Sequence, residues 1–289
     1  MASLRPDIQE KWVTVNGLKI RYWEKGSGMP LVCVHGLGPV LSADQWLLVA
    51  DDFSKFARVI ALDMPGWGES DFPPAGTTDC FQLFSDVLKG FCDALGLKQV
   101  DVMGQSMGGW DACLFAYDHP EMVRRIVLVG NAGLNPPLAN IGQPFKLPER
   151  EEIRNTLVRE WREFHPITDE IVEALYQRMH AKQGRVETMQ AIRDAINNAA
   201  SREKYSLRTR LPKMQQPILA VWGDDAPGIR LVNGIDAFQL APNARLQVCY
   251  NGDHSAMGYA YDQFLPAARR FLTQAEVKPA QKLPAIAGT

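Results

Sequence analysis

The chain has 289 residues, of which 46% are apolar, and its formal net charge is -2. This length and composition predict a globular fold with a sizeable core, either one domain with an insertion or two domains. The near-neutral charge, without a run of Lys and Arg, argues against nucleic acid or a charged membrane surface as partner. A small-molecule substrate needs no such field, and the sequence leaves a homo-oligomer open.

The termini and the cysteines indicate the compartment. The N-terminal stretch MASLRPDIQEKW has no apolar segment of a secretory signal, and no run approaches the ~18 apolar residues of a membrane span. The five cysteines are scattered without a C-x-x-C pair, which favours free thiols over disulfides or a metal site. We therefore expect a cytoplasmic protein with no metal and no cofactor.

The first third of the chain alternates between strand and helix patterns. Residues 12–26 hold two alternating runs around Asn16 and Gly17, a dipeptide that tight hairpins prefer. Helical spacing follows at 81–96 and 107–120. Four short apolar runs have the composition of buried parallel strands: 31–36, 58–63, 100–104 and 125–130. The alternation predicts an α/β fold with a mostly parallel sheet after an antiparallel hairpin.

The strand pattern stops at Asn131 and returns only at 217–223 and 244–252. Between them lie three segments with the apolar stripes of amphipathic helices. We expect a helical cap at 135–211, inserted after the sixth strand and placed over the carboxyl edge of the sheet, where open α/β sheets bind ligands. The core then comprises 1–134 and 212–275, and 276–289 is expected to be a flexible tail.

A glycine-rich turn follows the strand at 100–104. Its sequence, GQSMG, matches G-x-S-x-G, and a helical pattern comes directly after it. A sharp strand-to-helix turn of this kind exposes a serine above the sheet, and small neighbours allow the close approach that it needs. The alternative is a glycine-rich turn with an incidental serine. The context favours Ser106 as a nucleophile.

A serine nucleophile needs a base, and the chain has five histidines. In this fold the order along the chain is nucleophile, acid, histidine, and only His254 follows every other element. His119 beside a proline is expected to be a helix cap or a surface residue, and His165 and His180, in the predicted insert, are expected to be structural or solvent-facing. His35 ends an early strand. His254 is therefore the predicted base.

The acid and the oxyanion donors follow from the same order. The strand at 217–222 ends in Gly223, Asp224 and Asp225, and either aspartate could orient the imidazole. We choose Asp225, with Asp224 as the alternative. The backbone N–H groups of Leu37 and Met107 are the predicted oxyanion hole.

Together these residues resemble the α/β-hydrolase superfamily from about residue 12 to 272. Its motifs appear in the family's order as HGLG, DMPGWGES, GQSMGG, the loop at 223–226 that holds the predicted acid (the acid loop), and GDH. The resemblance implies a Ser-His-Asp hydrolase. A serine nucleophile argues against the superfamily's epoxide hydrolases and haloalkane dehalogenases, which use a carboxylate.

Within the superfamily, HGLGPVLSADQW, LVGNAGL and EALYQRMHAKQG are similar to meta-cleavage product hydrolases. That resemblance implies hydrolysis of a C–C bond in a 2-hydroxy-6-oxo-dienoate-like or β-diketone compound. It also implies that an arginine of the insert, Arg178, binds the acidic end of the substrate, which the planar guanidinium fork suits. Other candidates for substrate contact are Gly38, Gln45, Gln105 and Trp110.

The chain departs from this family at several positions. Gln105 replaces an Asn, Ser255 replaces a Trp, and the acid loop is one residue shorter, so that the family's aspartate position falls on Ala226. A carboxylesterase or lactonase with the same Ser and His is the alternative function, and Arg178 would then be incidental. A further alternative is a ligand receptor on a hydrolase scaffold.

Overall fold

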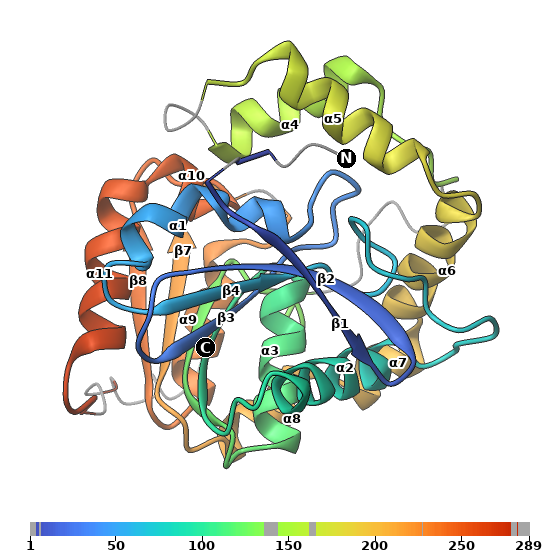
Figure 1. Ribbon diagram of the computed structural model, residues 1–289. Coiled ribbons are helices and arrows are strands. Elements are labelled where there is room, and N and C mark those ends of the chain that lie inside the picture. The colour runs from blue at the N-terminus through green and yellow to red at the C-terminus, as the bar shows by residue number, and fades with distance from the viewer. Residues whose placement is uncertain are drawn as a thin grey trace.

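The computed structural model describes residues 4–5, 7–135, 144–161, 166–226, 228–278 and 282. Within these residues eight strands form one sheet in the order β1-β2-β4-β3-β5-β6-β7-β8 (Figure 1). β1 and β2, and β2 and β4, pair antiparallel, and the other pairs are parallel. The strands are β1 (Glu10–Val15), β2 (Leu18–Lys25), β3 (Pro30–Val34), β4 (Arg58–Leu62), β5 (Val100–Gln105), β6 (Val123–Val129), β7 (Ile218–Gly223) and β8 (Ala244–Cys249).

The hairpin between β1 and β2 forms where the sequence predicts it. Asn16 and Gly17 both have positive φ, 49° and 82°, as a two-residue hairpin turn requires. Val15 pairs with Leu18 across the turn. The predicted fold class, a mostly parallel sheet with an N-terminal antiparallel hairpin, is confirmed.

Helices pack on both faces of the sheet because the buried strands present apolar side chains on both sides. On one face, α2 (Cys80–Ala94), α3 (Met107–Asp118) and α9 (Leu231–Leu240) share a core with alternate strand residues such as Val32, Val34 and Val102. On the other face, α1 (Leu47–Phe53), α10 (Ala256–Tyr259) and α11 (Tyr261–Thr273) pack on Leu31, Cys33 and Met103.

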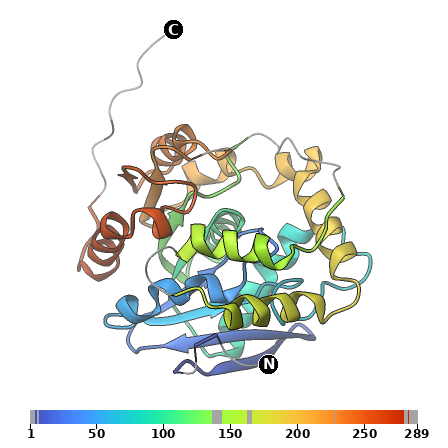
Figure 2. The ribbon, with the colours of Figure 1, turned by 90° about the horizontal axis from the view of Figure 1, so that it is seen from above.

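The segment between β6 and β7 is helical, as predicted. It contains α4 (Arg150–Trp161), α5 (Asp169–His180), α6 (Arg185–Asn197), α7 (Ala199–Lys204), α8 (Leu207–Arg210) and the 3-10 helix η2 (Leu211–Lys213). Seen from above, α4 and α5 lie across the end of the sheet (Figure 2). We call residues 150–210 the helical insert.

The division into a core of 1–134 with 212–275 and a cap of 135–211 stays a prediction. The expected flexible tail at 276–289 lies largely outside the described residues. In the ranges that the structure describes, none of the helices combines the length and apolar character needed to cross a membrane.

Candidate active site

Ser106 occupies a strained turn between β5 and α3. Its φ of 55° and ψ of -118° lie in a region that non-glycine residues rarely adopt. Its N–H donates to the Val129 carbonyl at 3.0 Å, and its carbonyl accepts from the Ala132 N–H at 2.9 Å. These bonds hold the strain in place. The turn is the strand-to-helix turn that the sequence predicts.

The two flanking glycines are required by close packing. A Cβ on Gly104 would lie 2.2 Å from the Gly108 carbonyl oxygen, and one on Gly108 would lie 2.2 Å from the Val34 carbonyl oxygen. Any side chain at either position would push α3 away from the sheet. The glycines of the G-x-S-x-G pattern therefore serve the packing that exposes Ser106.

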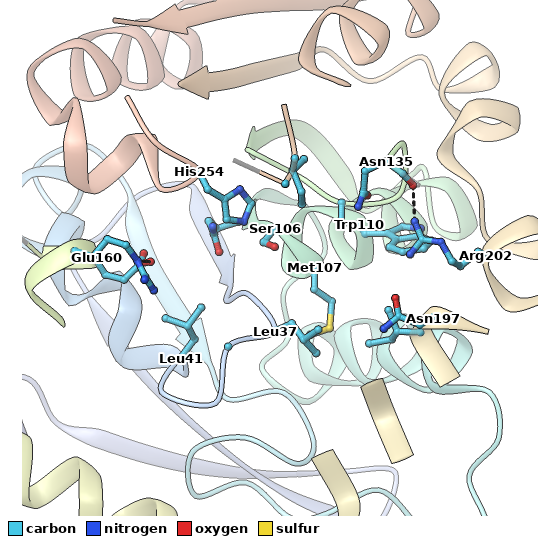
Figure 3. A pocket seen from close by; sticks show the side chains of 17 residues that line it. Leu37, Leu41, Ser106, Met107, Trp110, Asn135, Glu160, Asn197, Arg202 and His254 are labelled. Carbon is cyan, nitrogen blue, oxygen red and sulfur yellow. Dashed lines mark hydrogen bonds and ion pairs between the residues drawn. The ribbon is translucent and has the colours of Figure 1, made fainter. Parts of the chain in front are cut away.

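A cavity of about 270 Å³ lies between the end of β5 and the helical insert. Figure 3 shows the side chains that line it, with Ser106 near its centre. Its sheet side carries most of the predicted site residues: Leu37, Gly38, Gln105, Ser106, Met107, Trp110 and His254. Its insert side carries Arg159, Glu160, Ile196, Asn197 and Arg202.

His254 is held neutral in this cavity. The pKa of His254 is lowered to about 4, mainly by burial; the charge of Asp253 opposes this shift and the charge of Arg159 adds to it. The backbone N–H of His254 donates to the Asp253 carboxylate at 2.5 Å. An uncharged imidazole at neutral pH is the form that accepts a proton.

The predicted pairing of His254 with an aspartate is not formed. Among the described residues, Nδ1 of His254 has no hydrogen-bond partner, and a Cβ on Gly130 would lie 3.0 Å from it. Asp224 and Asp225 are exposed. An oxygen of the Asp224 carboxylate accepts from the Gly252 N–H at 3.2 Å, and the Asp225 N–H donates to the Gly252 carbonyl at 3.1 Å.

The shortness of the acid loop explains why neither aspartate pairs with His254. Its aspartates are tied to the turn at Gly252, and the position that follows them is the buried Ala226, which has no carboxylate. The structure therefore places neither Asp225 nor Asp224 as an orienting acid for His254.

The predicted oxyanion donors lie at the same cavity. Met107 is the first residue of α3, where backbone N–H groups have no helical acceptor. Leu37 follows Gly36, whose N–H donates to Oε1 of Gln45 at 3.1 Å. Leu37 and Met107 both line the cavity with Ser106. The role of their backbone N–H groups as the oxyanion hole stays a prediction.

Gln45 does not line the cavity. It is buried behind the wall, where its amide N–H donates to Oε1 of Gln105 at 3.3 Å. The expectation that Gln45 contacts substrate is corrected. Gln45 positions Gln105 and Gly36 instead, because both ends of its side-chain amide are hydrogen-bonded to them.

Arg178 is also placed away from the cavity, and its expected contact with substrate is corrected. Its side chain is 2% exposed and pairs with Asp44 at 2.5 Å, Glu69 at 3.0 Å and Glu10 at 3.1 Å. Three carboxylates thus neutralise this guanidinium. Arg21 belongs to the same cluster, through Glu10, Asp44 and Asp63.

The other described histidines have structural places. Buried His35 bonds the Gly36 carbonyl through Nδ1 at 2.7 Å and accepts from the Met64 N–H at 3.1 Å. His119 caps the end of α3, and exposed His180 stacks on Tyr176. These agree with the sequence-based expectations. The prediction for His165 lies outside the described residues.

The sequence did not single out the polar residues of the insert that face the cavity, Arg159, Glu160, Asn197 and Arg202. An apolar stripe shows which face of a helix is buried, and gives no signal for polar side chains at the rim of that face. In the described ranges, no group of three His, Cys, Asp or Glu residues could hold a metal ion.

Comparison with known proteins identifies the class. Residues 29–260 match the family model described as the alpha/beta hydrolase fold. The chain belongs to this family, and the prediction of a hydrolase with this fold is confirmed.

Individual relatives have names that are more specific than the description of the family. The chain is 30% identical over 277 residues, 89% of this chain and 91% of the relative, to 2-hydroxy-6-oxononadienedioate/2-hydroxy-6-oxononatrienedioate hydrolase 1 of Dechloromonas aromatica (strain RCB). A 2-hydroxymuconate semialdehyde hydrolase of Pseudomonas sp. (strain CF600) is 39% identical over 134 residues, 46% of this chain and 47% of that one. A crystal structure of a meta-cleavage product hydrolase superposes with a TM-score of 0.76 at 25% identity, covering 92% of this chain and 98% of that one.

Proposed function

We propose that Ser106 and His254 hydrolyse a C–C bond in a 2-hydroxy-6-oxo-dienoate-like compound. The observation that carries the proposal is the strained φ of 55° at Ser106, in a cavity that neutral His254 also lines. The names of the relatives supply the bond type, because they describe hydrolases of 2-hydroxy-6-oxo acids. The predicted substrate class agrees with them.

The first step forms a bond to the ketone carbon. His254 accepts the proton of the Ser106 hydroxyl, or of a water beside it, and the oxygen attacks the carbonyl. The carbonyl electrons move onto its oxygen, which the N–H groups of Leu37 and Met107 stabilise.

The second step breaks the C–C bond. Before the attack, the 2-hydroxydienoate tautomerises to a 2-oxo-3-enoate, in which the hydroxyl proton has moved to C5. The oxyanion then collapses, and the bonding pair moves from C5 through the C3–C4 double bond onto the 2-oxo oxygen, which the imidazolium of His254 protonates to give a 2-hydroxydienoate. If Ser106 is the attacking group, water then releases the acyl chain as a carboxylic acid. An ester requires no such electron sink, because an alkoxide can leave by itself.

One comparison of substrates tests the proposal. We would measure kcat/KM for a coloured ring-fission dienoate and for p-nitrophenyl acetate, using wild type, Ser106→Ala and the control Ser54→Ala. We expect dienoate turnover by wild type and by Ser54→Ala, and a loss of at least about 10³-fold in Ser106→Ala. An inert dienoate beside rapid ester hydrolysis would make the protein an esterase. Full activity in Ser106→Ala would remove the nucleophile.

A further inference from the structure

Arg202 brings an unneutralised cation to the cavity. It lies on α7, and its guanidinium carbon is 5.2 Å from the centre of the Trp110 ring. One of its nitrogens donates to the Asn135 carbonyl at 2.5 Å. No carboxylate pairs with it in the part of the chain that the structure describes, and burial lowers the pKa of its guanidinium.

Two other arginines of the helical insert are already neutralised. Arg178 has three carboxylate partners, and Arg159 lies 3.5 Å from the carboxylate of Glu160. A half-buried charge without a counter-ion costs free energy, and an anion that enters the cavity recovers it. The fork of N–H groups on Arg202 suits a carboxylate in particular.

Asn197 adds an acceptor at the same end of the cavity. Its side-chain Nδ2 donates to the Arg193 carbonyl at 2.9 Å, and because a carbonyl can only accept, the amide oxygen must point the other way. In the part of the chain that the structure describes, that oxygen is buried without a hydrogen-bond partner, and the residue is 7% exposed. A buried acceptor of this kind is satisfied by a ligand that donates a hydrogen bond.

The opposite side of the cavity offers an anion no free cation. Glu160 is 6% exposed and pairs with Arg159, and among the described residues its Oε2 is buried without a hydrogen-bond partner. Figure 3 shows Glu160 on one side of Ser106, and Arg202, Trp110 and Asn197 on the other. The unpaired cation at one end and the neutralised pair at the other favour binding of an acidic substrate with its carboxylate toward Arg202.

We propose that Arg202 and Asn197 form the specificity site for a 2-hydroxy acid. Arg202, stacked on Trp110, binds the carboxylate, and Oδ1 of Asn197 accepts from the adjacent hydroxyl. The reacting ketone of an extended substrate then lies toward Ser106. This inference rests on the proposed function for the hydroxy-dienoate itself, although the carboxylate site can be tested without turnover.

Binding of two isosteric ligands tests the carboxylate site. Calorimetry would give the dissociation constants of sorbate, a planar dienoate, and of its neutral amide, sorbamide. We expect wild type to prefer sorbate by roughly 10- to 100-fold. Arg202→Gln should remove the preference, and Arg202→Lys, which keeps the charge without the fork, should retain part of it.

The matched control is Lys204→Gln, which removes a cation from the same helix. Lys204 pairs with Asp79 and does not line the cavity, so the preference for sorbate should match that of wild type. A preference that survives in Arg202→Gln, or is absent from wild type, would overturn the inference. Thermal melts would establish that each variant is folded.

Binding tests the hydroxyl contact. In an inactive Ser106→Ala background, Asn197→Leu should reduce the preference, measured as a ratio of dissociation constants, for a 2-hydroxy-dienoate over its 2-deoxy analogue, and an unchanged ratio would overturn the assignment of Asn197. If wild type does not turn over the dienoate at all, the proposed function fails. The sorbate measurement still decides whether Arg202 binds a carboxylate.

Discussion

Arg178 of α5 donates to the carboxylate of Asp44 in the 3-10 helix η1 (Ala43–Trp46) at 2.5 Å, and this contact ties the helical insert to the core. Although burial opposes it, the charges of Arg21 and Arg178 lower the pKa of Asp44. Glu10 and Glu69 complete the partners of Arg178. An arginine that the family resemblance assigns to substrate thus holds the insert in place.

Replacing Arg178 should therefore reduce stability. In Arg178→Met the buried carboxylate of Asp44 and the part-buried carboxylate of Glu69 lose a partner, and removal of one member of a buried ion cluster typically costs about 3–5 kcal/mol. Urea unfolding would measure the loss. The control is Arg150→Gln, which breaks an exposed pair with Glu173 in the same insert and should have a much smaller effect. Equal free energies of unfolding for wild type and Arg178→Met would contradict the claim that Arg178 holds the insert on the core.

The pH dependence of kcat/KM should report the low pKa of His254. The base acts when neutral, so activity should fall only as the pH drops through about 4, rather than near the ordinary histidine value of about 6.5. A pH series with a neutral ester would measure this limb. A limb at pH 6.5 or above would show that a carboxylate pairs with His254 in the working enzyme.

Neither aspartate of the acid loop should behave as a triad acid. Asp224→Asn and Asp225→Asn should each reduce kcat by less than about tenfold, whereas loss of a true triad aspartate costs about 10⁴-fold. Steady-state kinetics on one substrate would compare them. A loss of several thousandfold in either variant would identify that residue as the orienting acid.

Asp111 should make stability depend on pH. This residue of α3 is fully buried, neither carboxylate oxygen has a hydrogen-bond partner among the described residues, and burial raises its pKa well above the usual value. The folded state therefore binds more protons than the unfolded state above pH 3.8, so this group contributes a stability that falls as the pH rises.

Asp111→Asn removes that titration. Relative to wild type, the variant should become more stable as the pH is raised from 4 to 8, which urea unfolding at a series of pH values would show. Asp86→Asn, on the exposed side of α2, is the control for the substitution itself. A constant difference between Asp111→Asn and wild type would contradict the burial argument.

The order of motifs along the chain and the local turn sequences were enough to predict Ser106 and His254. The elbow around Ser106 depends on glycines within five residues, and His254 follows from its place after the last strand. The orientation of insert side chains depends on how helices dock. Arg178 lies among the buried residues Val172, Leu175 and Met179 of α5, and no periodicity shows which carboxylates meet it.

The prediction that Asp225 or Asp224 orients His254 was wrong for a geometric reason. Its shortening by one residue leaves Ala226 at the position where the resemblance expects an aspartate, and Asp224 bonds the Gly252 turn instead. Counting along a loop cannot predict which neighbouring aspartate faces inward, because a shift of one residue turns the side chain away.

Product analysis of one reaction tests the central claim most directly. We would incubate wild type and Ser106→Ala with a 2-hydroxy-6-oxo-dienoate, follow the loss of its colour and identify the products by mass spectrometry. The account predicts a carboxylic acid and a 2-hydroxydienoate from wild type, with formation at least about 10³-fold slower in Ser106→Ala. Unchanged dienoate with wild type, or equal product formation by both proteins, would contradict it.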